Sequence, residues 1–296
     1  MKVTVAKALG TCFGVQDAID LAMDETYHDD LTIVGQLVHN PQVVEDLRNH
    51  GVHIVDKLDD SITTKHVMIT AHGAPQSMHE NARARGFNVI DASCPLVLRV
   101  HKAIAQFVRD GFHPVVVGQE THVEVKGIVG DLEDYTVIAS PDEIRALEGR
   151  AKIGIVCQTT QQIDYVSGLV QQIRTTYPEM QIRFTDTVCQ PTKDRQVAAR
   201  ELAAEVDLMI VIGGHNSSNT KKLKLVCERM GIDAFHIDRV NQLRPEMFEG
   251  KSHVGITAGT STPREVIEEV YEAILAMPEV DITSASGMPP REKYLH

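Results

Sequence analysis

The segment Ile90-Asp91-Ala92-Ser93-Cys94-Pro95 places one cysteine between two different apolar patterns. Residues 87–90 form an apolar run typical of a buried strand, and residues 96–108 repeat apolar side chains at helical spacing. A cysteine between a strand and a helix lies near free backbone N–H groups and the positive end of the helix dipole. Both favour the thiolate, which is the form of cysteine that binds metals.

The same order of strand, cysteine and helix occurs around two further cysteines. Apolar residues 3–6 precede Cys12, and a strand pattern over residues 182–185 precedes Cys189. The interval from each cysteine to the glycine that ends the next predicted strand is 23 or 24 residues: Cys12 to Gly35, Cys94 to Gly118, and Cys189 to Gly213. This agreement predicts a threefold internal repeat, although its period exceeds that of ordinary solenoid proteins.

Strand and helix patterns alternate along the whole chain, which predicts parallel sheets covered by helices. We therefore expect an α/β fold of three pseudo-equivalent lobes with mainly parallel sheets around a central site. The expected boundaries are residues 1–88, 89–184 and 185–281 for the lobes, and 282–296 for a polar C-terminal tail. Ligands bind beyond the carboxyl ends of parallel strands, so polar residues at those ends are the candidates for the site.

Composition narrows the classes of partner. The formal net charge of −12 argues against nucleic acid or an acidic membrane. Aromatic residues make up 4% of the chain and Trp is absent, which argues against a base-stacking surface. No apolar stretch reaches the ~18 residues of a membrane span, and the N-terminus lacks the apolar core of a signal peptide. We expect a soluble cytoplasmic protein, and five cysteines, an odd number, argue against a disulfide framework.

Three thiolates at equivalent positions indicate a metal centre. A structural zinc site usually has four protein ligands, and no fourth cysteine has an equivalent position. Three thiolates suit a 4Fe–4S cluster with one open iron, which can bind substrate as a Lewis acid and electron donor. Of the other cysteines, Cys227 falls in a helical pattern and reads as a buried apolar residue. Cys157 ends a predicted strand and is either a redox-sensitive neighbour of the site or an inert substitute for Ser or Ala.

Polar residues at the other strand ends suit an anion. His39, His72 and His122 each follow a predicted strand by a few residues. A single histidine of this kind is more often structural, but three around one centre can bind a group such as diphosphate. The third repeat offers hydroxyl and amide groups instead, which also bind phosphate oxygens. These are Ser217, Ser218, Asn219 and Ser261.

Two further residues are candidates for proton transfer. Glu124 lies two residues after His122, so on an extended segment the two side chains share a face. Such a glutamate is either a solvated surface residue or a proton donor beside the cluster. Thr159 follows a predicted strand and can hydrogen-bond to a substrate hydroxyl or relay protons, although the segment alone is a weak signal.

Taken together, the motifs resemble the LytB/IspH family, 4-hydroxy-3-methylbut-2-enyl diphosphate reductase, over nearly the whole chain. Singly most of them are unspecific, but they stand in family order. They are Cys12-Phe13-Gly14-Val15, Leu37-Val38-His39-Asn40, Ala71-His72-Gly73, Asp91-Ala92-Ser93-Cys94-Pro95, His122-Val123-Glu124, Gln158-Thr159-Thr160, Asn216-Ser217-Ser218-Asn219 and Ala258-Gly259-Thr260-Ser261.

The resemblance implies an iron–sulfur reductase. It would convert 4-hydroxy-3-methylbut-2-enyl diphosphate to isopentenyl and dimethylallyl diphosphates by two-electron reductive dehydroxylation, the terminal step of the methylerythritol phosphate pathway. By this resemblance one 4Fe–4S cluster with an open iron has Cys12, Cys94 and Cys189 as ligands. Glu124 delivers protons and Thr159 lies near the substrate hydroxyl. The diphosphate is held by His39, His72, His122, Ser217, Ser218, Asn219 and Ser261.

A ferredoxin or flavodoxin is the expected electron donor, because the chain has no nucleotide-binding fingerprint; Gly213-Gly214 is not a G-x-G-x-x-G turn. The sequence departs from the family after Cys189, where residues 191–195 replace the usual Ala-Thr-x-Asn-Arg, and at Thr11, where an aromatic residue is usual. Three alternatives stay open. They are a non-catalytic iron–sulfur sensor or diphosphate-binding protein on the same scaffold, a zinc hydrolase, and a relative that acts on another allylic diphosphate.

Overall fold

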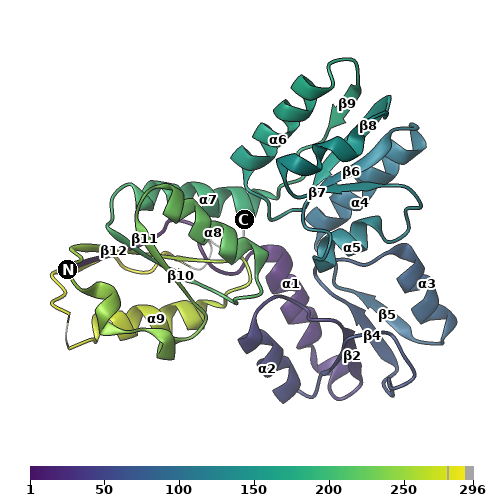
Figure 1. Ribbon diagram of the computed structural model, residues 1–296. Helices are drawn as coiled ribbons and strands as arrows, with labels where there is room; N and C mark the ends of the chain where they lie inside the picture. The colour runs from purple at the N-terminus through teal and green to yellow at the C-terminus, as the bar shows by residue number, and fades with distance from the viewer. Residues whose placement is uncertain (279, 291–296) are drawn as a thin grey trace. The chain divides into compact units, whose positions relative to one another are not determined.

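The structure is a computed structural model that describes residues 1–278 and 280–290. Its strands form three sheets, and every strand pair is parallel (Figure 1). Sheet A has the order β11 (Asp233–Ile237), β10 (Leu208–Ile212), β12 (His253–Ala258), β1 (Lys2–Val5), β13 (Ser284–Ala285). Sheet B has the order β3 (His53–Val55), β2 (Leu31–Val34), β4 (His66–Ile69), β5 (Asn88–Asp91). Sheet C has the order β7 (Thr136–Ile138), β6 (His113–Val117), β8 (Lys152–Cys157), β9 (Gln181–Phe184).

Helices connect the strands. The α-helices are α1 (Phe13–Ala22), α2 (Pro41–Asn49), α3 (Gln76–Ala84), α4 (Pro95–Arg109), α5 (Val123–Val129), α6 (Ile163–Thr176), α7 (Gln190–Ala203), α8 (Ser218–Arg229) and α9 (Arg264–Leu275). Short 3-10 helices are η1 (Glu25–Tyr27), η2 (Pro141–Leu147), η3 (Val240–Gln242) and η4 (Pro245–Phe248). No helix within the described ranges combines the length and apolar composition needed to cross a membrane.

The three sheets repeat one strand order. If the strands of each repeat are numbered along the chain, sheets B and C both read second, first, third, fourth. Sheet A has the same order, but its fourth place is taken by β1 from the start of the chain. The predicted α/β fold of three repeated parallel sheets is therefore confirmed.

The cysteine of each repeat lies where the chain leaves one sheet. Strand β5 pairs with β4 in sheet B, and after Cys94 the chain enters α4, which packs on β6 and β8 of sheet C. The expected lobe boundaries 1–88 and 89–184 instead group β1 with sheet B and cut β5 after its first residue, Asn88. A local pattern identifies a strand but not its partner strand, so the boundaries stay a prediction. Of the expected tail 282–296, residues 291–296 lie outside the described residues.

The chain divides into two compact units. One unit contains sheet A and comprises residues 1–16, 39–43 and the described residues from 190 onward. The other contains sheets B and C and comprises residues 17–38 and 44–189. We call them the A unit and the BC unit.

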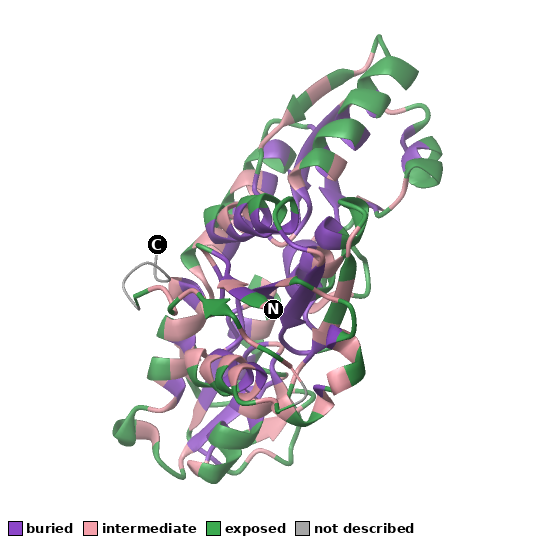
Figure 2. Cartoon of the chain, turned by 90° about the vertical axis from the view of Figure 1, so that its left-hand side faces the viewer, coloured by how far each residue is buried: buried purple, intermediate pink, exposed green. Residues whose placement is uncertain are grey.

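Sheets A and C alternate their side chains between two helix layers. In the A unit, Leu208 and Ile210 of β10 pack with α9, whereas Met209 and Val211 pack with α7 and α8 on the opposite face. Sheet C is covered in the same way by α6 on one face and by α4 and α5 on the other. Buried residues accordingly follow the strands, and exposed residues follow the outer faces of the helices (Figure 2). Two-sided burial explains why these strands read as continuous apolar runs.

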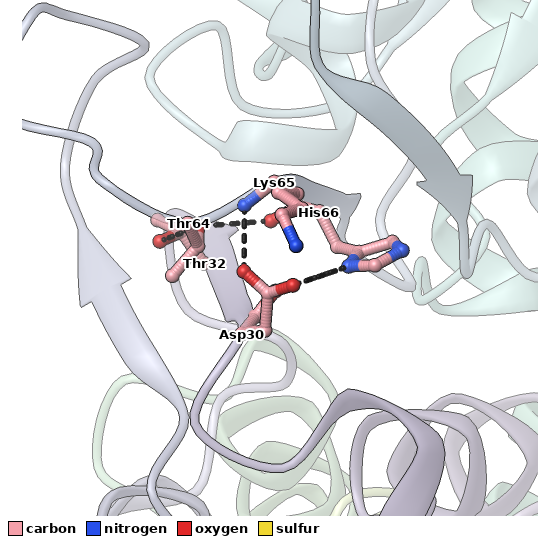
Figure 3. Close-up of polar contacts among 5 residues, drawn as sticks. All are labelled: Asp30, Thr32, Thr64, Lys65 and His66. Carbon is pink, nitrogen blue, oxygen red and sulfur yellow. Dashed lines mark hydrogen bonds and ion pairs between the residues drawn. The ribbon is translucent and has the colours of Figure 1, made fainter.

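A carboxylate fixes the register at the amino-terminal edge of sheet B (Figure 3). Asp30 accepts a hydrogen bond from the Lys65 amide at 2.8 Å, and its other oxygen lies 3.4 Å from His66 Nδ1. The Lys65 amide lowers the pKa of Asp30. The hydroxyls of Thr32 and Thr64 lie 2.7 Å apart beside this pair. Asp30 precedes β2 and His66 begins β4, so these contacts align the two strands.

Side-chain contacts also link neighbouring segments at the amino-terminal edges of sheets A and C. In sheet A, Asp207 before β10 accepts from the amides of Ser252 and His253 at 2.9 and 3.2 Å. In sheet C, Lys152 at the start of β8 lies 5.0 Å from the ring centroid of Phe112, which precedes β6. The amino-terminal edges are therefore structural, which leaves the carboxyl ends of the strands for chemistry.

Candidate functional site

The three predicted metal-binding cysteines share one backbone setting. Each follows the fourth strand of a sheet, and its amide donates to the carbonyl of the second residue past the end of the neighbouring strand. The bonds are Cys12 to Thr260 at 3.1 Å, Cys94 to Ala71 at 3.1 Å, and Cys189 to Thr159 at 3.0 Å. All three thiols are therefore presented at the carboxyl end of a parallel sheet, as the repeat predicted.

The turns that lead into the cysteines differ in chemistry. Asp91 and Asp186 each lie three residues before a cysteine and accept a hydrogen bond from the amide two residues later, at 2.9 and 3.0 Å. The turn before Cys12 uses Gly10 instead, with φ +75°. A side chain at Gly10 would also meet Ile267 Cδ1 at 2.8 Å, so both the conformation and the packing require glycine.

The donor set suits iron–sulfur chemistry. None of the five cysteines forms a disulfide; Cys12 is buried, and Cys94 and Cys189 are half-buried. Cys12 belongs to the A unit, and the other two belong to the BC unit. In residues 1–278 and 280–290, no three His, Cys, Asp or Glu side chains are placed to hold one metal ion. Convergence of the three thiols on one cluster therefore stays a prediction.

The remaining two cysteines have a different environment. Cys157 is fully buried in the core under sheet C, and Thr187 Oγ1 binds both its amide and its carbonyl at 2.7 Å. Cys227 on α8 is also fully buried, which raises the pKa of its thiol to about 12. Cys227 is thus an inert packing residue, as the sequence indicated.

Glu124 and Thr159 form a buried pair in the BC unit. Glu124 is 2% exposed, and Thr159 is 5% exposed. Glu124 Oε1 accepts from the Thr159 amide at 2.6 Å, and Oε2 accepts from the Thr159 hydroxyl at 2.9 Å. The carbonyl of the same threonine accepts from the Cys189 amide. Thr159 is therefore hydrogen-bonded both to Glu124, the candidate proton donor, and to the backbone of Cys189, a candidate cluster ligand.

The expectation that His122 and Glu124 lie on an extended segment is wrong. His122 is the N-cap of α5, and its Nδ1 accepts from the Glu124 amide at 3.1 Å. A ring that accepts at Nδ1 carries its proton, when neutral, on Nε2. The helix start fixes the ring, and it turns Glu124 inward to Thr159.

His72 and His122 come together in the same unit. Their ring centroids lie 6.0 Å apart with the rings nearly perpendicular. The loop that carries His72 approaches α5 closely: a Cβ at Gly127 would lie 3.2 Å from the Gly73 carbonyl, and one at Gly130 would lie 2.3 Å from Pro75 Cγ. Glycine at position 127 in α5 and at its C-cap, position 130, therefore permits the two imidazoles to meet.

The remaining predicted anion-binding residues gather in the A unit. Ser217 caps α8, and its hydroxyl accepts from the Thr220 amide at 3.3 Å. Ser218 and Asn219 form the first turn of this helix, and Asn219 is 2% exposed. Neither Asn219 amide atom has a hydrogen-bond partner in the described part of the chain. A buried side-chain amide of this kind is suited to a polar ligand.

His39 lies next to these hydroxyls. Ser261 Oγ donates to the His39 carbonyl at 3.2 Å, and a Cβ at Gly214 would lie 2.6 Å from that same oxygen. Burial lowers the pKa of the His39 imidazole, and the nearby charge of Lys221 lowers it further. Lys221 therefore brings a positive charge to this group. The sequence did not indicate Lys221 as a site residue, because it lies inside helix α8 and not at a strand end.

These features define an α/β protein of three repeated parallel sheets that presents thiols, imidazoles, hydroxyls and one buried carboxylate at its strand ends. The chain belongs to the LytB family, since the family model described as LytB protein matches residues 3–275. The resemblance indicated by the motifs is therefore confirmed.

Curated relatives cover almost the whole chain. A Geotalea uraniireducens protein is 39% identical over 279 residues, which are 93% of this chain and 97% of the relative. A Vibrio parahaemolyticus protein is 34% identical over 93% of this chain and 90% of its own length. An Aquifex aeolicus protein is 35% identical over 96% of this chain and 99% of its own length. All three bear the name 4-hydroxy-3-methylbut-2-enyl diphosphate reductase.

Solved structures share the fold. The E-1-hydroxy-2-methyl-but-2-enyl-4-diphosphate reductase from Plasmodium falciparum aligns with a TM-score of 0.88 over 98% of this chain and 93% of that chain. Its sequence identity of 23% makes this a likeness of fold alone. A structure of (E)-4-hydroxy-3-methyl-but-2-enyl diphosphate reductase is 35% identical, with a TM-score of 0.67 over 93% of this chain and 99% of that chain.

Proposed function

We propose that this chain is a 4-hydroxy-3-methylbut-2-enyl diphosphate reductase, which forms isopentenyl and dimethylallyl diphosphates by reductive dehydroxylation. Membership of the LytB family and the names of its relatives support the activity. The structural observation that carries the proposal is the buried pair of Glu124 and Thr159. A non-catalytic sensor or binding protein does not need a buried acid tied to a hydroxyl, whereas a reductase that removes a hydroxyl group as water does.

The three strand-end cysteines are the proposed ligands of one 4Fe–4S cluster with an open iron. Their matched backbone bonds, and the absence of a disulfide at each of them, support this assignment for Cys12, Cys94 and Cys189. Thiolates are the ligands that hold such clusters. When bound, the cluster would pass on the external donor's two electrons one at a time and would supply a Lewis-acidic iron for the substrate oxygen.

The diphosphate is the proposed partner of the imidazoles, hydroxyls and amide. Imidazole N–H groups and hydroxyls donate to phosphate oxygens without requiring a large positive net charge. The unpartnered amide of Asn219, within the described residues, and the positive charge of Lys221 support an anion in the A unit. The proposed set is His39, His72, His122, Ser217, Ser218, Asn219 and Ser261.

The proposed role of Glu124 is to donate one of the two protons that the reaction consumes. Replacing the allylic hydroxyl by hydrogen consumes two electrons and two protons: one proton leaves with the hydroxyl as water, and the other goes to carbon. We assign the first proton to Glu124, with the Thr159 hydroxyl orienting the carboxyl and contacting the substrate hydroxyl. Burial of the pair keeps bulk water from the carboxyl, so the proton goes to the substrate.

Two further parts of the proposal concern partners and place. The electrons come from a ferredoxin or flavodoxin, which matches the low potential that iron–sulfur reductions require. Cysteines outside disulfides and reductive chemistry both suit the cytoplasm, where thiols are kept reduced. We therefore retain a cytoplasmic location as part of the same proposal.

Glu124→Gln tests the central assignment. This variant removes the proton and keeps the size of the side chain, so iron and sulfide content should equal that of the wild type while turnover falls about 100-fold or more. Glu120→Gln, at an exposed position four residues earlier, is the matched control and should keep full turnover. Normal turnover in Glu124→Gln would contradict the assigned role, and turnover lost in both variants would mean that the effect is not specific to Glu124.

A further inference from the structure

Arg195 of α7 is the largest of the fully buried side chains in the described chain, with 1% of its surface exposed. An arginine side chain stays charged under all physiological conditions, so its burial is costly unless its donors are satisfied. The matching positions, six residues after the other two cysteines, are Ala18 and Val100, which are buried apolar residues. A charged side chain at this place in the repeat therefore needs a specific reason.

The guanidinium donates to the two residues that precede Cys12. Its Nε lies 2.9 Å from the Gly10 carbonyl oxygen, and its Nη2 lies 3.3 Å from the Thr11 carbonyl oxygen. A third bond, from Nη1 to the Pro191 carbonyl at 2.9 Å, ties the fork to the first turn of α7. All of these atoms belong to the A unit.

The peptide group that joins Thr11 to Cys12 is thus held from two sides. Its carbonyl oxygen accepts from Arg195, and its N–H, which is the Cys12 amide, donates to the Thr260 carbonyl at 3.1 Å. The preceding Gly10 is held in the same manner, because its amide donates to the carbonyl of residue 258 at 3.2 Å while its carbonyl accepts from Arg195. Rotation of this segment would break bonds on both sides at once.

We infer that Arg195 is the positioning residue of the Cys12 thiol. Its planar fork holds the carbonyls of Gly10 and Thr11 and thereby fixes the direction in which Cys12 leaves the turn. The other two cysteines take this support from an aspartate in the turn, whereas the Cys12 turn has no such residue. The inference rests on the proposed function only in that it treats Cys12 as a cluster ligand.

Hydrogen exchange on the full-length, anaerobically purified protein tests the positioning. Arg195→Met should speed exchange of the amides in residues 10–12 about tenfold, since charged hydrogen bonds are lost there. Residues 92–94, at the equivalent turn before α4, should exchange as in the wild type. Arg195→Lys, which keeps the charge but not the fork, should restore part of the protection. Arg200→Met, at an exposed position on the same helix, is the control and should match the wild type.

A second readout links the turn to the cluster. In the iron-loaded protein, Arg195→Met should lose iron to a chelator several times faster than the wild type and the Arg200→Met control. Unchanged exchange at residues 10–12 would overturn the inference, as would equal acceleration at residues 92–94 in both Arg195 variants, because that result means general loosening. Faster exchange without faster iron loss would overturn the link to Cys12 as a ligand. A wild type that binds no iron would instead contradict the proposed function, and the exchange data would still decide the role of Arg195.

Discussion

At the scale of single residues, substitution of a proposed ligand cysteine and substitution of Cys227 should have opposite effects on the bound iron and sulfide. Substitution of serine for Cys12, Cys94 or Cys189 should each reduce bound iron and sulfide to below half of the wild-type content, because three thiolates are needed to hold the cluster. Cys227→Ala should keep the full content, since that thiol is buried and its pKa is raised to about 12. Iron and sulfide determined on anaerobic preparations of the four variants provide the check. Full iron in any one of the three serine variants would remove that residue from the ligand set.

The sequence indicated which residues belong to the candidate site, but it did not indicate the hydrogen bonds between them. The motifs named Glu124 and Thr159, but nothing in the sequence joined them, because they lie 35 positions apart and their bond depends on where α5 begins. That start depends in turn on a histidine acting as N-cap, and histidine is not among the preferred capping residues. Arg195 was visible only as the last residue of the segment 191–195 after Cys189, and the usual family segment also ends in arginine. Its burial follows from tertiary packing, which a local pattern does not report.

At the scale of elements, the contact between β8 and α4 predicts a large effect of a small change. A Cβ at Gly154 would lie 2.3 Å from Cγ of Phe107, which packs on that face of sheet C. Gly154→Ala should therefore lower the free energy of unfolding by about 1–3 kcal/mol. Gly168→Ala is the matched control, because no atom lies within 4 Å of the added Cβ and the position is inside helix α6. That variant should be stabilised by about 0.5–1 kcal/mol.

Denaturant unfolding of the two glycine variants gives the comparison directly. Equal stability of Gly154→Ala and the wild type would contradict the described packing of α4 on sheet C.

Element type followed from periodicity, whereas sheet membership did not. Buried apolar runs ending in turn residues identified the strands, since both faces of sheets A and C are covered by helices. The pairing of β1 with β12 joins the two ends of the chain, and no local signal distinguishes it from pairing with the nearer β2. Equal spacing of the repeats does not fix the residue at which one lobe ends and the next begins. The cysteine-bearing turn could therefore be assigned to the sheet before it or to the sheet after it.

At the scale of the whole molecule, buried histidines set part of the pH dependence of stability. Burial is the main cause that lowers the pKa of His101 and of His236 below the ordinary value. Between about pH 7 and pH 5 the unfolded chain takes up protons on these residues that the folded chain does not. Stability should therefore be full above this window and should fall as the pH decreases through it. The carboxylates with lowered pKa, such as Asp30, act at lower pH, below about 4.

His236→Gln isolates one of these contributions. The variant cannot take up a proton at this position, so its free energy of unfolding should fall less steeply from pH 7 to pH 5 than that of the wild type. Urea unfolding at pH 5, 6 and 7 measures both slopes. Parallel slopes would show that His236 titrates alike in the folded and unfolded states.

The central claim is that this chain is an iron–sulfur reductase of an allylic diphosphate. The most direct test is anaerobic: iron and labile sulfide are determined on the purified protein, and consumption of 4-hydroxy-3-methylbut-2-enyl diphosphate is followed with a reduced low-potential donor. The account predicts close to four iron and four sulfide per chain, with isopentenyl and dimethylallyl diphosphates as products. A loaded cluster without consumption of this substrate, or no bound iron after anaerobic reconstitution, would contradict it.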